Sequence, residues 1–138
     1  MLSNDTLIFV VALLPVLIAL YFIYRKDKNN PEPTWQVQYK KLRACSLYDY
    51  FDNVILSEDA GANKPSRKFF DYAFEKTGAK VETTLMIGDN YNADIEGAMD
   101  YGLDTILFNR WDPNFVPPRK PTHIVRELME IKDYINNL

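Results

Sequence analysis

Short apolar segments alternate with helix-like segments from residue 36 onward, and this alternation limits the fold more than any other feature of the sequence. Thr83–Ile87 (TTLMI) is apolar on both faces and runs directly into Gly88-Asp89. Asp104–Phe108 (DTILF) has the same character, and Asn53–Ser57 (NVILS) is a third short segment rich in strand formers. Strands that are apolar on both faces occur in parallel sheets that helices cover on both sides. The sequence therefore predicts an α/β domain with these three segments as a parallel core.

Helices are predicted between and after these strands. Pro65–Thr77 has proline near its first turn and Gly78 just past its last residue, a strong pair of start and stop signals. The other predicted elements are helices at Gln36–Cys45, Asp94–Tyr101 and Arg126–Ile135, with a short extended piece at Thr122–Val125.

An uncharged run precedes this domain. Leu7–Tyr24 is eighteen residues long, and as a helix it would span roughly 27 Å, close to the hydrocarbon thickness of a bilayer. Lysine and arginine follow the run within residues 25–28 and are absent before it, which favours a cytoplasmic C-terminal part. We expect a single-pass transmembrane anchor with a basic flank at 1–30, a linker at 31–35 and a domain at 36–138. The alternatives are a buried helix, which leaves the protein cytoplasmic, or an artefact of where the reading frame was opened.

Composition excludes several classes of function. The net charge of −3 and a pI near 5.1 argue against a nucleic-acid binder, which is usually basic. The single cysteine, Cys45, cannot form a disulfide within the chain. The single histidine, His123, argues against a histidine-based metal site or a Ser-His triad.

Two carboxylates follow the Thr83–Ile87 strand, and ligands of open parallel sheets bind beyond the carboxyl ends of strands. Asp89 ends the strand, and Asp94 stands about where the next helix begins. The four residues between them can fold back and bring the carboxylates together. Paired carboxylates suit Mg²⁺, which takes one or two of them together with waters and phosphate oxygens. The same pattern also occurs as a turn followed by a helix cap.

A lysine stands at the start of the predicted helix. Pro65 fixes the helix start, so we expect Lys64 to project from a helix N-terminus, where unpaired N–H groups and the dipole favour an anion. A lysine adds a point charge suited to phosphate. Lys-Pro alone is a weak signal, but Lys-Pro, a helix, an apolar strand and Gly-Asp-x4-Asp in this order indicate a phosphoryl-transfer site.

Residues 36–138 resemble the C-terminal half of a haloacid dehalogenase (HAD) superfamily hydrolase, and within it the pyrimidine 5′-nucleotidase-like branch. The resemblance lies in VQYKKLRACSLYDYFDNVILSEDAGANKPSRKFFDYAF, TTLMIGDNYNADIEGAMDYGLDTILFNRW and THIVRELMEI. It implies a Rossmann-like, HAD-type sheet, a Mg²⁺-dependent phosphoric monoester hydrolase and a phosphorylated small molecule, such as a nucleotide, as ligand. NKP matches the third family motif, which implies that Lys64 steadies the phosphate and the nucleophile. GDNYNAD matches the fourth, which implies that Asp89 and Asp94 hold Mg²⁺.

The sequence departs from the family at its front. The first family motif is an apolar strand ending in Asp-x-Asp, which neighbours the strand of the fourth motif and carries the nucleophile. No two aspartates in this chain are separated by a single residue. The second-motif strand and the substrate-selecting cap should also precede Gln36, where the uncharged run stands instead. The resemblance therefore implies a partial HAD-like domain: a phosphatase remnant that is inactive alone.

Two other functions stay open. In the family the first two motif strands lie between the counterparts of NVILS and TTLMI, so their loss would leave a gap or an open sheet edge that invites a protein partner. The chain would then be a membrane-tethered, non-catalytic binding or interaction module. The second alternative is a truncated reading frame without a function of its own.

Overall fold

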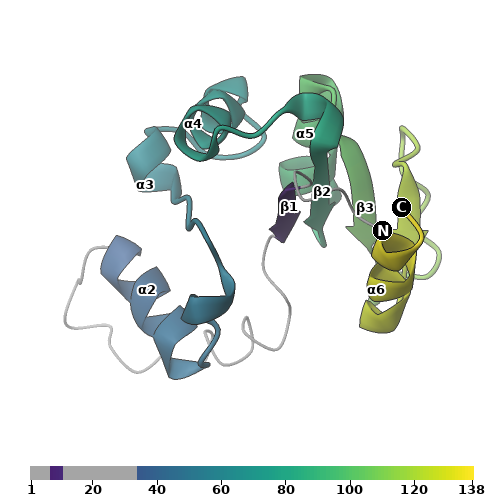
Figure 1. Cartoon of the computed structure of the whole chain (residues 1–138). Coiled ribbons are helices and arrows are strands. Elements are labelled where there is room, and N and C mark those ends of the chain that lie inside the picture. The colour runs from purple at the N-terminus through teal and green to yellow at the C-terminus, as the bar shows by residue number, and fades with distance from the viewer. Residues whose placement is uncertain (1–6, 11–33) are drawn as a thin grey trace.

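The computed structural model describes residues 7–10 and 34–138. In this part of the chain, four strands form one sheet in the order β1-β2-β3-β4, and all three pairings are parallel. Figure 1 shows the strands side by side, from the purple β1 to the yellow-green β4. Their bounds are β1 (Leu7–Val10), β2 (Thr84–Gly88), β3 (Asp104–Phe108) and β4 (His123–Val125). The predicted parallel α/β sheet is confirmed.

Helices connect and flank the strands. The α-helices are α2 (Thr34–Ala44), α3 (Ser57–Ala60), α4 (Arg67–Thr77), α5 (Gly97–Tyr101) and α6 (Leu128–Asn136). Shorter pieces are the 3₁₀ turns η1 (Tyr48–Tyr50) and η2 (Val81–Thr83) and the π-helical η3 (Tyr91–Glu96). As predicted, α4 ends at Gly78, which has the left-handed φ of 68° that suits a glycine C-cap. Because α2 begins at Thr34, the last two residues of the predicted linker lie in a helix.

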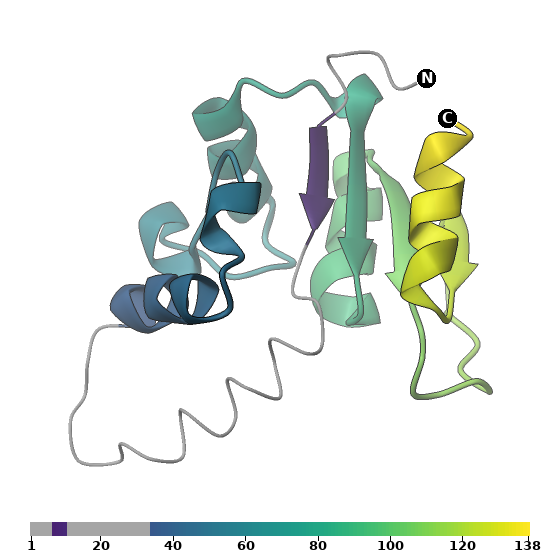
Figure 2. The same ribbon diagram turned by 60° about the horizontal axis from the view of Figure 1, so that its bottom comes forward.

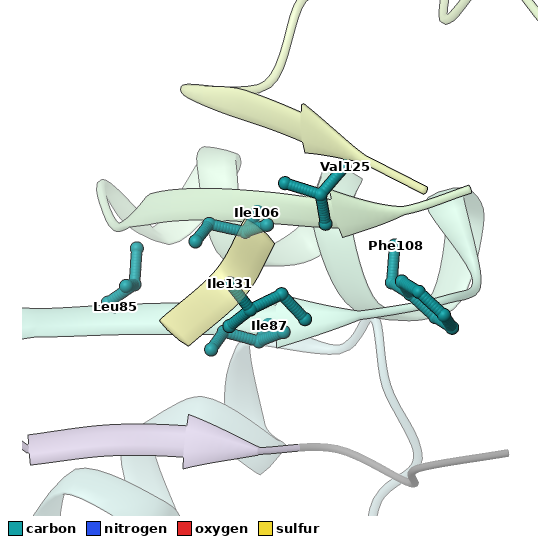
Figure 3. Packing of buried hydrophobic residues seen from close by; sticks show 6 residues of the cluster. All are labelled: Leu85, Ile87, Ile106, Phe108, Val125 and Ile131. Atoms are coloured by element: carbon teal, nitrogen blue, oxygen red, sulfur yellow. The ribbon is translucent and has the colours of Figure 1, made fainter. Parts of the chain in front are cut away.

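Helices cover both faces of the sheet. On one face α6 packs against side chains from three strands, and Figure 3 shows this cluster: Leu85, Ile87, Ile106, Phe108, Val125 and Ile131. On the other face Met86 packs with Phe70 of α4 and Ala98 of α5. Successive residues of β2 thus point to opposite buried layers. This arrangement explains why the sequence of β2 is apolar throughout.

The position of β1 corrects the predicted transmembrane helix. Leu7–Val10 are the first four residues of the uncharged run, and they pair with β2 from Leu7↔Thr84 to Val10↔Ile87. No helix in the described ranges is long and apolar enough to cross a bilayer. Residues 11–33, which hold the rest of the run and its basic flank, lie outside the described residues. An apolar run suits a buried parallel strand as well as a helix, and periodicity alone does not distinguish the two.

The predicted strand at Asn53–Ser57 is also wrong. The chain is extended at Leu56, and α3 begins at Ser57, but no strand pairing involves this segment in the described part of the chain. A strand needs a neighbour for its backbone groups, and β1 occupies the edge of β2 on which this strand was expected. Leu56 is buried nonetheless. The apolar character of the segment therefore reflects packing and not sheet formation.

Candidate active site

Three predicted site residues meet beyond the carboxyl end of β2. The Lys64 Nζ atom lies 2.5 Å from Asp94 Oδ1, although the two residues are 30 positions apart. Asp89 follows β2 directly, and its carboxylate is within electrostatic range of both Asp94 and Lys64. The structure therefore brings together the lysine and both carboxylates that the two motifs singled out.

The Asp94 carboxylate is buried and hydrogen-bonded through both of its oxygens. Its side chain is only 5% exposed. Oδ1 accepts a hydrogen bond from Lys64, and Oδ2 accepts one from the Asn90 backbone N–H at 3.3 Å. The predicted helix start at Asp94 is wrong, because the π-helical turn begins at Tyr91. Asn90 provides its N-cap, and its Oδ1 accepts a hydrogen bond from Ala93 N at 3.0 Å.

Two glycines allow the close approach of the elements that carry these residues. A Cβ atom on Gly88 would lie 2.4 Å from Asp94 Cβ, so η3 packs directly on the end of β2. A Cβ atom on Gly97 would lie 2.5 Å from Pro65 Cβ and 2.8 Å from Pro65 O, so α5 packs directly on the turn that carries Lys64. The sequence interpretation missed Gly97 and Asn90, because their importance comes from contacts between segments and not from a local pattern.

Lys64 occupies a turn, so the prediction that it projects from a helix N-terminus is wrong. Ser66 N donates to Asn63 O at 2.9 Å, and α4 begins only at Arg67. The Lys64 side chain is 17% exposed, and its Nζ atom lies 5.8 Å from the centroid of the Phe69 ring. The positive charge of the site therefore comes from the ammonium group itself and not from the dipole of α4.

Asp89 lies where a negative charge is disfavoured. Burial raises the pKa of its carboxyl, and the nearby Asp94 raises it further, whereas a hydrogen bond from its own backbone and the Lys64 charge act in the opposite direction. Burial outweighs these compensating interactions because water would otherwise solvate the carboxylate. A cation bound beside Asp89 would remove this penalty.

The carboxylate pair fits a magnesium ion. Mg²⁺ uses one or two protein carboxylates and completes its shell with waters and phosphate oxygens. Among the described residues, no group of three or more His, Cys, Asp or Glu side chains gathers at one point. Asp89 and Asp94 would thus be the described protein ligands, and Asp89 is the more available because Lys64 already neutralises Asp94. An ion bound there would neutralise charge on phosphoryl oxygens.

Comparison with known proteins identifies the family of this chain. The HAD-hydrolase-like family profile matches residues 61–131, which include Lys64, Asp89 and Asp94. The chain belongs to the HAD-like hydrolases. The resemblance predicted from the sequence is therefore confirmed.

Several HAD-like relatives are similar over most of this chain. The HAD-hydrolase YfnB of Bacillus subtilis is 42% identical over 101 residues, which cover 72% of this chain and 43% of YfnB. Pyrimidine 5′-nucleotidase YjjG of Escherichia coli is 35% identical, covering 69% of this chain and 44% of the enzyme. Glyceraldehyde 3-phosphate phosphatase of Methanocaldococcus jannaschii is 30% identical, covering 73% of this chain and 45% of the enzyme.

The crystal structure of YfnB bound to magnesium matches the fold with a TM-score of 0.69 and 39% identity, over 73% of this chain and 45% of YfnB. The HAD-like chain thus spans less than half the length of these relatives. Their similarity establishes the family and the fold of the matched part.

Proposed function

We propose that this chain supplies the phosphate-binding lysine and the magnesium-binding carboxylates of a HAD-type phosphatase site, and that it does not hydrolyse phosphate esters by itself. The ligand in this proposal is a phosphorylated small molecule such as a nucleotide. That substrate class is supported by the names of the relatives, which include a pyrimidine 5′-nucleotidase and a glyceraldehyde 3-phosphate phosphatase.

The observation that carries the proposal is the contact between Lys64 and Asp94 beside Asp89. The ion pair holds the ammonium group at the edge of the sheet where ligands of parallel α/β folds bind. There the Lys64 ammonium group can neutralise charge on a phosphoryl group. Asp89 can bind a cation beside it. None of the three residues is a nucleophile in this role. They would bind the phosphoryl group and the cation, but they would not attack phosphorus.

The proposed inactivity is supported by the sequence of the strand beside β2. The family places its Asp-x-Asp nucleophile on the strand that neighbours the fourth motif, and β1 has this position. β1 ends at Val10, and Val11 and Ala12 follow in the sequence, so no carboxylate occurs where this motif would stand. Charge stabilisation without a nucleophile leaves a small residual rate at most.

Binding and turnover measured on the purified chain test this proposal. Inorganic phosphate should bind in the presence of Mg²⁺, and calorimetry should show weaker phosphate binding in Lys64→Ala and weaker Mg²⁺ binding in Asp89→Asn. Lys68→Ala is the matched control, because Lys68 is an exposed lysine of α4 that donates to Gly61 O. Equal affinities in all four proteins would remove the site from consideration.

Turnover of p-nitrophenyl phosphate and of nucleoside monophosphates with Mg²⁺ should not exceed that of buffer. Hydrolysis that persists through purification, and that disappears in both Lys64→Ala and Asp89→Asn, would contradict the proposed inactivity. That result would mean that another residue serves as the nucleophile.

A further inference from the structure

The loop between β3 and β4 is fixed to the segment that follows Asp89. Tyr91 is buried, and its hydroxyl donates to Arg119 O and accepts from Arg119 N, both at 3.0 Å. The Tyr91 ring lies 5.6 Å from the ring of Phe115, centroid to centroid. Because Tyr91 is the second residue after Asp89, these contacts hold the loop beside the candidate site.

The loop begins with a closed turn that presents a tryptophan. Asn109 Nδ2 donates to Asp112 O at 2.7 Å, and Asn109 Oδ1 accepts from Asp112 N at 3.3 Å, so residues 109–112 form a compact turn. Asn109 N also donates to Val125 O at 2.8 Å, which ties the turn to β4. Trp111 lies within this turn and is 64% exposed.

The register of the sheet places this turn at the same edge as Asp89. Gly88 pairs with Leu107, so Asp89 lies beside Phe108, and the turn begins one residue later on the neighbouring strand. Adjacent strands are about 4.8 Å apart, and a turn keeps its ends within about 7 Å. Figure 2 shows the chain leaving the arrowhead end of β3, at the edge toward which β2 also points. The register therefore places the turn that contains Trp111 beside Asp89 at the ligand-binding edge of the sheet.

Trp111 offers an exposed aromatic surface at this edge. The Arg110 guanidinium carbon lies 5.5 Å from the centroid of the Trp111 ring, a distance at which a cation is attracted to the ring. Within the described residues the indole is otherwise largely open to solvent. Aromatic side chains bind nucleobases by stacking without hydrogen-bond readout, because every base has a flat π-face.

We propose that Trp111, backed by Arg110, is the residue that selects phosphate monoesters carrying a nucleobase. This inference rests on the proposed function, because the phosphate of the same ligand would bind at Lys64. It adds a specificity-determining residue outside both sequence motifs. The ligand class is a nucleoside monophosphate, with the base against the indole and the phosphate toward the lysine.

The test compares uridine 5′-monophosphate with ribose 5-phosphate, which has the phosphate and sugar but no base. With Mg²⁺ and the full chain, calorimetry should show about tenfold tighter binding of the nucleotide, the size expected for one stacked base. Trp111→Leu should lower the affinity for the nucleotide to that for the sugar phosphate, and it should leave the affinity for the sugar phosphate unchanged. Val116→Ser, a change at another exposed residue of the loop, should alter neither affinity. In a Trp35→Phe background, the nucleotide should quench the remaining indole fluorescence, and ribose 5-phosphate should not.

Equal affinity of the wild-type chain for both ligands would overturn the role of Trp111, as would a nucleotide preference that survives in Trp111→Leu. The proposed function has its own readout in the same experiment, because Lys64→Ala must weaken ribose 5-phosphate binding. Sugar-phosphate binding that does not depend on Lys64 would overturn the proposed function and leave the indole result standing. No binding of either ligand at millimolar concentration would overturn both.

Discussion

At the scale of single residues, the ion pair between Lys64 and Asp94 fixes the geometry of the site. With side chains only 17% and 5% exposed, each charge depends on the other for the stabilisation that water would otherwise provide. Removing one partner of such a pair leaves an uncompensated buried charge. We expect Lys64→Ala to lower the free energy of unfolding by about 2 kcal/mol in urea denaturation, less than for a fully buried pair.

The double variant Lys64→Met/Asp94→Leu separates this effect from a general loss of packing. Replacing both charges should cost less than the sum of the two single substitutions, because no charge is then left unpaired. Lys68→Ala should change the stability by less than about 0.5 kcal/mol, as surface substitutions usually do. If the change in the free energy of unfolding of the double variant equals the sum of the changes in the two single variants, the two charges are not coupled.

Asp89 should make stability depend on pH. Its pKa is raised in the folded state, first by burial and then by Asp94, so the folded chain binds a proton more readily than the unfolded chain. The contribution of Asp89 to the free energy of unfolding is therefore most favourable below the ordinary pKa of an aspartate. It is lost as the pH rises through the raised pKa of the folded state. Asp89→Asn should raise the melting temperature at pH 7 and have little effect at pH 3.

The exposed Asp52 provides the control for this measurement, because a substitution on the surface usually changes the stability by less than about 0.5 kcal/mol. A gain in Asp89→Asn that is the same at pH 3 and pH 7 would contradict an electrostatic origin. The comparison uses thermal unfolding in the absence of Mg²⁺, since a bound cation would offset the penalty on the carboxylate.

At the scale of elements, the contact between α5 and the turn at Lys64 depends on Gly97. Alanine there would favour the helix by about 1 kcal/mol, but its Cβ atom would lie 2.5 Å from Pro65 Cβ and 2.8 Å from the Pro65 Cα and O atoms. The backbone of the turn cannot yield as easily as a flexible side chain, and such overpacking costs about 1–3 kcal/mol. We expect Gly97→Ala to lower both stability and phosphate affinity, because the turn that carries Lys64 must move.

Gly78→Ala is the matched control, since Gly78 has a φ of 68° and nothing within 4 Å of an added Cβ atom. Its cost should be about 1 kcal/mol from backbone conformation, with phosphate affinity unchanged. Urea denaturation and calorimetry on the two variants distinguish a displaced site from a weaker fold. Unchanged phosphate affinity in a destabilised Gly97→Ala would show that the turn keeps its position.

At the scale of the whole molecule, local patterns predicted the elements that carry the site. β3 has the predicted bounds, β2 ends one residue later than predicted, and the glycine after α4 ends that helix. These signals are local, because apolar strands, a glycine cap and a proline turn act within a few residues. The expectation that Lys64 meets Asp89 and Asp94 was right, but its reason was not, because no strand of the described sheet precedes Lys64 in the segment that leads to it. The turn that carries Lys64 is positioned instead by its packing on α5 at Gly97.

Two of the elements that the sequence did not predict depend on contacts between distant segments. The sequence favoured a helix for Leu7–Val10 and a strand for Asn53–Ser57, and the first segment occupies the edge of β2 that the second was expected to fill. α6 begins at Leu128 and not at Arg126, because Glu127 and Glu130 form a reciprocal cap in which Glu127 N donates to Glu130 Oε1 at 2.8 Å. For the two apolar segments, helix and strand are similar in local energy, and tertiary pairing decided between them. The start of α6 was instead set by this local cap.

The end of β1 provides a direct test of how the molecule is assembled. Val10 is the last residue of β1 and pairs with Ile87, two residues before Asp89, so its position lies at the same edge as the carboxylate pair. Val10→Asp should therefore add a third carboxylate near Asp89 and Asp94 and tighten Mg²⁺ binding several-fold in calorimetry, because Mg²⁺ gains a charged oxygen ligand.

Val10→Asn, which has a similar size and no charge, should leave Mg²⁺ affinity close to wild type. Leu7→Asp places the same charge at the opposite end of β1, beside Thr84, and should not tighten binding either. Thermal melts identify any variant that fails to fold. If a folded Val10→Asp binds Mg²⁺ no better than Val10→Asn, the end of β1 does not reach the site, and the strand beside β2 could not have carried the family's nucleophile in this chain.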